Sequence, residues 1–286
     1  MIKTNILPTN LNLILSRSHL LLFFMVIVIA DTFAQKRDIH QEEWSDLFNG
    51  VSLDGWDIKI AGHELNNNHH ETFRVENGIL KVDYSRYDDF DDRFGHIFYD
   101  ESFSHYRLVV EYRFVGEQVP GGPGWAYRNN GIMFHSQSAA SMKRDQHFPV
   151  SIEFQLLGGD GQQDRPNGSI CTPGTHVVVD GTLETSHCTD SGGPTHHGDQ
   201  WVRAELVVHG DSLARHILNG ESVIEYSGLQ LVDGTPLASG FIALQSESHP
   251  THFRSVRILN LRGCMDPNAT NFKSYYVADD PVTCEY

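Results

Sequence analysis

Residues 150–156 alternate strictly between apolar and polar side chains, and they carry a first candidate for acid–base chemistry. The apolar side chains occupy every second position, as in a β-strand with one buried face: Val150, Ile152, Phe154 and Leu156. Glu153 and Gln155 fall on the opposite face. In a curved sheet that face can form the floor of a groove, where a carboxyl group can act as a general acid or base. The alternative is an ordinary solvated strand face.

Two other strand-like segments are followed by residues whose side chains, like that of Glu153, can transfer protons. Residues 129–134 are followed by His135, and residues 240–245 are followed at a short distance by Glu247. Functional groups concentrate on loops that a rigid scaffold holds in place. We therefore take Glu153, His135 and Glu247 as the candidates for proton transfer.

The elements that must position these residues are short strands. Between residues 44 and 261, apolar runs alternate with Gly, Asn, Asp and Pro, and no segment predicts a long amphipathic helix. Asn77-Gly78 and Asn219-Gly220 each stand between two such runs, which is a strong signal for a β-hairpin. Many short strands at this spacing predict an all-β sandwich or barrel.

An ordered set of motifs links this region to a known family. The motifs lie at residues 114–118, 120–125, 129–133, 152–159, 171–178, 198–202, 218–221, 240–247 and 253–258. Each is weak alone, but together and in this order they resemble the 3-keto-disaccharide hydrolase domain family. The resemblance implies a concanavalin-A-like jelly-roll sandwich and an exported protein that degrades sugars. It transfers no catalytic residue to this chain.

The sequence departs from the commonest family pattern at two places near the predicted groove. Asn130 and His135 stand where many members have Ser and Arg, and Ser248-His249 stands where many have Gly-Gly. These changes leave the identity of the sugar open.

A 3-keto sugar, which the resemblance implies as substrate, needs particular groups. The ketone acidifies the proton on C2, and a base that removes this proton can expel the group on C1. Such a reaction requires a base, an acid for the leaving oxygen and stabilisation of the enolate. Glu153 or Glu247 could be the base, and His135 or His176 the acid.

The remaining candidates would bind the sugar. Gln155, Gln245 and Asn130 could bind hydroxyl groups, Trp125 could stack on the ring, and His176 could also line the groove. A divalent cation could stabilise the enolate, although no His-x-His or His-Glu-x-x-His run supports it.

Two other functions remain open. A conventional retaining or inverting glycosidase could use Glu153 and Glu247 as its carboxylate pair. A lectin on the same sandwich would bind carbohydrate without catalysis, in a shallow groove with no carboxyl group of shifted pKa.

Four cysteines predict two disulfides, because an even count is typical of an exported chain. Local pairing is the simplest arrangement: Cys171 with Cys188, and Cys264 with Cys284. Residues 263–286 would then form a small closed module, too short for a core of its own. This module resembles a Cys- and Asp-rich repeat appended to exported bacterial proteins, and four of its side chains could hold calcium: Asp266, Asn271, Asp279 and Asp280.

The two ends complete the predicted organisation. Residues 20–30 are apolar, follow Lys3 and Arg17, and precede small residues up to Ala34. This predicts a signal peptide at residues 1–34, a secreted or periplasmic mature chain and no transmembrane segment within it. The jelly roll then covers residues 44–262. A formal net charge of −16 without any Lys/Arg cluster disfavours nucleic acid as a partner and leaves carbohydrate as the expected one.

Overall fold

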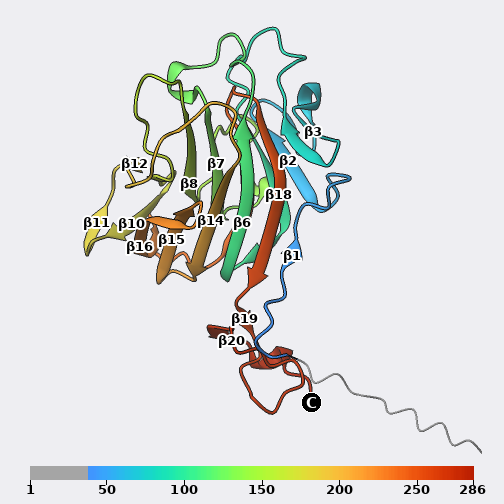
Figure 1. Ribbon diagram of the computed structural model, residues 1–286, viewed down its shortest axis with the longest axis vertical. Coiled ribbons are helices and arrows are strands. Elements are labelled where there is room, and N and C mark those ends of the chain that lie inside the picture. Colours follow the sequence, from blue (N-terminus) through green and yellow to red (C-terminus); the bar gives the residue numbers. More distant parts are fainter. Residues whose placement is uncertain (1–37) are drawn as a thin grey trace, which may run out of the picture. The chain divides into compact units, whose positions relative to one another are not determined.

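The computed structural model describes residues 38–286, so the predicted signal peptide at residues 1–34 lies outside the described residues. The described part is all-β, as predicted: two antiparallel sheets pack face to face in a jelly-roll sandwich (Figure 1). Only short 3-10 turns supplement the strands in this part of the chain: η1 (His69–Glu71), η2 (Gly124–Ala126), η3 (Ala139–Ser141) and η4 (Pro281–Thr283).

The larger sheet has ten strands. In spatial order they are β11 (Thr182–Glu184), β10 (Thr175–Val179), β16 (Glu221–Leu231), β15 (Leu213–Leu218), β14 (Val202–His209), β6 (His105–Phe114), β18 (Thr251–Asn260), β4 (Ile79–Val82) and β3 (Phe73–Glu76), with β1 (Ser45–Asp46) also paired to β18.

The smaller sheet has eight strands and carries the segments that the sequence singles out. Its order is β12 (Cys188–Thr189), β9 (Ile170–Cys171), β8 (Ile152–Gly159), β7 (Asn129–Ser136), β17 (Gly240–Ser246), β5 (Gly95–Phe103) and β2 (Trp56–Ile60), with β13 (His196–His197) paired in parallel to β8.

The core lies between the two sheets and follows from the alternation of the strands. Ile152, Phe154 and Leu156 of β8 are fully buried in the same apolar cluster as Leu108 and Val110 of β6. Because successive side chains of a strand point to opposite faces, the odd-numbered residues of β8 lie on the outer face of the small sheet. The sequence prediction for this strand is confirmed at these positions.

The two predicted Asn-Gly hairpins are also present. Asn77 and Gly78 join β3 to β4 with φ values of 54° and 75°, and Asn219 and Gly220 join β15 to β16 with φ values of 49° and 93°. Two consecutive positive φ values define the turn whose twist matches that of paired strands.

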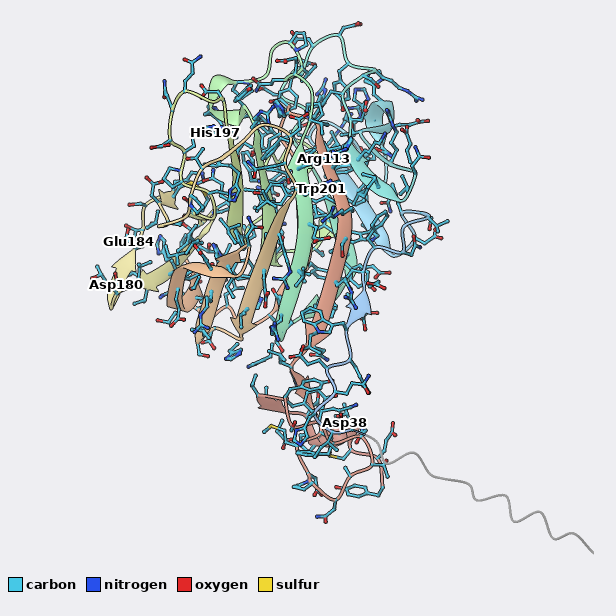
Figure 2. All side chains as sticks on the ribbon, in the orientation of Figure 1. Asp38, Arg113, Asp180, Glu184, His197 and Trp201 are labelled. Atoms are coloured by element: carbon cyan, nitrogen blue, oxygen red, sulfur yellow. A yellow bond between two sulfur atoms is a disulfide. The ribbon has the colours of Figure 1, made fainter. Side chains whose placement is uncertain are left out.

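The outer faces of the two sheets differ in character. On the ten-stranded sheet, Arg113 and Arg254 lie over the Trp201 ring at 4.7 and 4.5 Å from its centroid; Figure 2 labels Arg113 and Trp201. On the eight-stranded sheet a second apolar cluster covers part of the face, and it includes Phe98, Met133 and Ala243. The rest of that face carries the polar residues of the candidate site.

The C-terminal segment continues from the end of β18 and is closed by a disulfide. β19 (Arg262–Gly263) pairs in parallel with β20 (Ala278–Asp279) (Figure 1). Cys264 is bonded to Cys284, with 4.9 Å between their Cα atoms. Buried Lys273 forms an ion pair with Glu43, so this segment contacts the residues that precede β1.

The side chains proposed as calcium ligands already have partners: Asp266, Asn271 and Asp279 form hydrogen bonds within the C-terminal segment, and Asp280 forms an ion pair with Arg262. Asp266 accepts from the Asn268 backbone and from the Tyr286 hydroxyl, and Asp279 accepts from the Met265 backbone. These bonds hold the turns of the segment together.

Within residues 38–286 no helix is long and apolar enough to cross a membrane.

Candidate functional site

A pocket of about 340 Å³ opens on the outer face of the eight-stranded sheet. Its polar side chains are Asn129, Glu153, Gln155, His187 and Glu247. The remaining lining comes from Trp125, Phe148, Cys171, Pro173 and Cys188. The pocket therefore combines carboxyl and amide groups with a largely apolar wall, as sites for small ligands commonly do.

Strand register brings Glu153 into the centre of this face. Glu153 of β8 lies opposite Met133 of β7 on one side and opposite Cys171 of β9 on the other. Its neighbours in the chain, Ile152 and Phe154, point into the core, so its carboxyl group must point outward. Only 6% of Glu153 is exposed, because the surrounding loops cover this face.

Glu247 enters the same pocket from the end of β17. It is 3% exposed, and its Oε2 has no hydrogen-bond partner within the protein. The next residue is held tightly: the backbone N–H of Ser248 donates to the Tyr84 hydroxyl at 2.8 Å, and Ser248 has a φ of 84°. Such strain in a non-glycine residue persists only where surrounding contacts enforce it, and here those contacts fix the place where Glu247 leaves the strand.

The absence of a side chain at Gly131 makes room for the polar groups. A Cβ atom on Gly131 would overlap Oε1 of Glu153 and would lie 2.8 Å from Oε1 of Gln245. Glu153 from β8 and Gln245 from β17 therefore meet over the backbone of β7. A glycine at this position leaves room for that close approach.

Both carboxyl groups have unusual acidities. Burial raises the pKa of Glu247, and burial together with the charge of ionised Glu247 raises the pKa of Glu153 well above its usual value. The two groups therefore ionise one after the other. Between the two steps the pocket holds one carboxylate and one carboxylic acid, which is the combination that a proton-transfer reaction needs.

Aromatic rings form one side of the pocket. Trp125 is 54% exposed and stacks on Phe94 at 5.7 Å between ring centroids, and Phe94 also packs against Phe148 at 5.2 Å. Arg165 anchors the loop that carries Trp125, because its guanidinium donates to the backbone carbonyls of Trp125 and Gly158. Exposed aromatic faces of this kind suit the apolar face of a sugar ring or an apolar substituent.

A disulfide forms another part of the wall, directly beside Glu153. Cys171 and Cys188 are bonded, with 4.1 Å between their Cα atoms, and they join β9 to β12. Both predicted disulfide pairings are thus present. This one ties residues 172–187 to the edge of the sheet next to the carboxyl pair.

The sequence-derived candidates do not all meet in one place. Glu153, Glu247, Gln155 and Trp125 line the pocket, and Gln245 lies directly beside it over Gly131. The other three candidates are placed elsewhere.

His135, Asn130 and His176 make different contacts. His135 is 1% exposed, its Nε2 donates to the Gly210 carbonyl at 2.9 Å, and it borders a separate hollow with Leu237 and Phe241. Asn130 is fully buried and donates to the backbone carbonyl of Gln245. His176 lies on β10 in the ten-stranded sheet, opposite Gln230 of β16.

Several residues at or beside the site are not among the candidates predicted from the sequence, and they include Asn129, Phe148, Tyr84 and His96. Asn129 had a usable signal, because Ile132 and Phe134 are buried and strand alternation then places Asn129 on the outer face. His96 had the same signal from its buried neighbour Ile97. Phe148 and Tyr84 lie in loops, where side chains do not alternate as they do in a strand, so the sequence pattern gives no indication of their direction.

Among residues 38–286, no group of three or more His, Cys, Asp or Glu side chains is arranged to hold a metal ion.

The fold and the pocket together define the class of this protein. It is a jelly-roll protein with a buried pair of carboxyl groups on the outer face of one sheet. The model of the 3-keto-alpha-glucoside-1,2-lyase-like domain matches residues 43–259, and the chain belongs to this family. Family membership makes it a carbohydrate-active protein. No curated protein matches the sequence.

Two solved structures that are similar to this chain share little sequence with it. A protein of unknown function with a galectin-like fold from Bacillus subtilis is 13% identical, with a TM-score of 0.50, over 77% of this chain and 98% of its own. A candidate glycosyl hydrolase from Parabacteroides distasonis is 17% identical, with a TM-score of 0.47, over 77% of this chain and 100% of its own.

Proposed function

We propose that this protein cleaves the glycosidic bond of 3-keto-glycosides by elimination across C1 and C2. The observation that carries the proposal is the pair of buried carboxyl groups, Glu153 and Glu247, in a pocket of a size suited to a small glycoside. Membership of the 3-keto-alpha-glucoside-1,2-lyase-like family supports the choice of substrate.

The reaction follows from the acidity that a ketone confers on its neighbours. A carboxylate removes the proton from C2, and the electron pair moves into an enolate whose negative charge lies on the C3 oxygen. The C3 carbonyl then re-forms, a double bond forms between C1 and C2, and the bond from C1 to the aglycone oxygen breaks. A carboxylic acid protonates this oxygen as it leaves.

Burial and the proximity of the two carboxyl groups raise the pKa of both, so the pair passes through a singly ionised state that holds one base and one acid. We assign the base for C2 to Glu247 and the acid for the leaving oxygen to Glu153, and the leaving-group comparison described in the Discussion tests this assignment. Gln155 binds a ring hydroxyl beside Glu153, and Trp125 covers one face of the sugar.

Subsequent addition of water to the unsaturated product at C1 would make the overall reaction a hydrolysis. The proposal therefore covers both outcomes, and product analysis separates them. Elimination alone leaves a 2-hydroxy-enone, whereas elimination followed by hydration leaves a free 3-keto sugar.

The decisive experiment compares two substrates that differ only at C3. The purified protein is incubated with the 3-keto form of an aryl glucoside and with its unoxidised parent, and release of the phenol is followed. We expect release from the keto form alone. Release from the parent at a similar rate would instead support a conventional two-carboxylate glycosidase. Binding of either sugar without release would support a lectin-like role.

We also propose that the protein is exported through the segment at residues 1–34. Two disulfides in the mature part support an oxidising destination. Expression of the full sequence in a bacterial host, followed by mass spectrometry of the extracytoplasmic fraction, should give a chain that begins at Gln35. An uncleaved chain in the membrane fraction would contradict this proposal.

A further inference from the structure

One row of side chains crosses the outer face of the eight-stranded sheet and extends beyond the pocket. Gln155 of β8 lies opposite Gly131 of β7, and on the far side of Gly131, Gln245 of β17 lies opposite His96 of β5. Gln155 lines the pocket, whereas Gln245 and His96 are 0% and 1% exposed. The polar surface of the site therefore continues beyond the pocket to residues that are buried.

The buried end of this row is rich in polar atoms that have no protein partner. Both ring nitrogens of His96 and both amide atoms of Gln245 make no hydrogen bond within the protein, and the same holds for Oε2 of Glu247 and Oδ1 of Asn129. Buried polar groups are nearly always paired, so a cluster of this kind beside a pocket needs an explanation.

Neighbouring residues offer no structural reason for these unpaired atoms. Lys59, which lies opposite His96 on the other side, donates its ammonium hydrogens to the carbonyls of His63 and Arg144. Burial lowers the pKa of His96 to about 3, so its imidazole is neutral and keeps one N–H donor. His216 behaves differently: it is equally buried, and its two nitrogens bond to the Gly168 carbonyl and the Tyr226 hydroxyl.

One aromatic ring contacts both this polar end and the pocket. Phe148 lines the pocket and packs edge-on against His96 at 6.1 Å between ring centroids. It belongs to the loop between β7 and β8 and is half-buried. Of the aromatic contacts of His96, this ring is the one that also faces the pocket.

We propose that His96 and Gln245 form a subsite for the C3 ketone oxygen of the substrate, with Phe148 as its cover. This inference rests on the proposed function and adds the group that stabilises the enolate. An imidazole N–H and an amide N–H donate to the oxygen, and they bind it more tightly as charge develops there during removal of the C2 proton. Donors that carry no charge of their own form no ion pair with the carboxylate of Glu247, the proposed base.

The test uses binding, so that it does not depend on turnover. The ligands are a 1,5-anhydro-3-keto-hexitol, which has no aglycone, and the corresponding alcohol. The wild-type protein should bind the ketone more tightly than the alcohol. His96→Phe should reduce that preference by about tenfold or more, while affinity for the alcohol changes by less than about twofold.

Stability supplies the readout that separates a binding role from a structural one. His96→Phe removes two buried nitrogens that lack protein partners and places a ring beside Phe98 and Phe148, so its Tm should rise. His216→Phe is the matched control: it removes two satisfied hydrogen bonds, so its Tm should fall while the ketone preference stays unchanged.

Several results would overturn the inference. The first is that the wild type binds the ketone and the alcohol equally well. The second is that His96→Phe still prefers the ketone. The third is that the Tm of His96→Phe falls and its affinity for both ligands decreases equally. If His96→Phe does not fold, Gln245→Leu is tested in its place. An unchanged preference for the ketone in Gln245→Leu would also contradict the proposed subsite. Failure of the proposed function looks different: no phenol is released from the keto-glucoside, whatever the binding preference.

Discussion

Glu153 occupies the space above Gly131, where any side chain on β7 would displace its carboxyl group. The site therefore depends on a residue that contributes no chemistry of its own. Because the carboxyl group is the flexible end of Glu153, an added methyl group would move it and would leave the strands in place. Such a displacement affects the reaction more than the fold.

We expect Gly131→Ala to lower kcat/KM on a 3-keto-glycoside by about tenfold or more, since small misplacements of a reacting group have large effects on rate. Circular dichroism should show an unchanged fold. Gly124→Ala is the matched control, because no atom lies within 4 Å of a Cβ added there, and Gly124 adjoins Trp125 at the same pocket. Equal activity of the two variants would show that Glu153 needs no such placement.

Glu153→Gln should keep the fold and lose activity by on the order of a hundredfold, as expected for loss of a general acid. Glu247→Gln should lose at least as much, because it removes the base. A leaving group of low pKa needs less help from an acid as it departs. Glu153→Gln should therefore regain much of its activity on substrates with such leaving groups, whereas Glu247→Gln should not. A steady-state comparison of two aryl leaving groups checks this assignment, and the reverse pattern would exchange the two roles.

The carboxyl pair also predicts how stability depends on pH. In the unfolded chain both groups ionise near their usual pKa of about 4.5, whereas burial keeps them protonated in the folded protein to higher pH. Above pH 4.5, roughly, the unfolded state therefore holds fewer protons than the folded state, so the pair makes the free energy of unfolding decrease as pH rises. This decrease ends when the pH exceeds the raised pKa values of the two groups in the folded protein. The slope is about 1.4 kcal/mol per pH unit for each group.

Urea unfolding of the wild type and of Glu153→Gln/Glu247→Gln at several pH values between 5 and 8, roughly, measures this effect. The double variant should become progressively more stable than the wild type as pH rises. A constant difference between the two proteins across this range would mean that both carboxyl groups ionise normally in the folded state.

Strand periodicity explains which parts of the site the sequence could predict. Glu153 and Gln155 were placed correctly because three buried neighbours on β8 define its faces without ambiguity. Alternation on β7 carried equivalent information and would have selected Asn129 rather than Asn130. The same logic fails for His135, because a φ of 45° takes it out of the strand conformation and its ring bonds to the Gly210 carbonyl.

Other features depend on contacts between distant segments. Nothing local indicates that Phe148 covers His96, or that Tyr84 holds the backbone at Ser248, since these pairs join loops to strands far away in the chain. His176 lies in a region similar to the family, but its strand joins the opposite sheet. Sheet membership of a short strand is set by pairing partners that the sequence does not reveal.

The Cys171–Cys188 disulfide should matter for both stability and activity. Its two cysteines are 17 residues apart, so replacing both with Ala should cost about 3 kcal/mol on the chain-entropy model. Activity should also fall, because Cys171 lies opposite Glu153 and both cysteines line the pocket. Thermal unfolding and kcat/KM of Cys171→Ala/Cys188→Ala measure the two effects.

Cys264→Ala/Cys284→Ala provides the matched control. It opens a closed segment of similar length, because its cysteines are 20 residues apart in the sequence, and neither residue lines the pocket. We expect unchanged specific activity in this variant. Equal loss of activity in both disulfide variants would point to a general effect of stability rather than to the pocket wall.

The C-terminal segment is predicted to be dispensable for catalysis. None of the residues that line the pocket comes from residues 263–286, and the family match ends at residue 259. The segment is nonetheless attached: Lys273 pairs with Glu43, and the backbone N–H of Val277 donates to the Leu261 carbonyl. A chain ending at Arg262 should therefore fold with a somewhat lower Tm and full specific activity. A folded, inactive truncation would mean that the segment positions the pocket through β18, and the division of the chain at residue 262 would then be wrong.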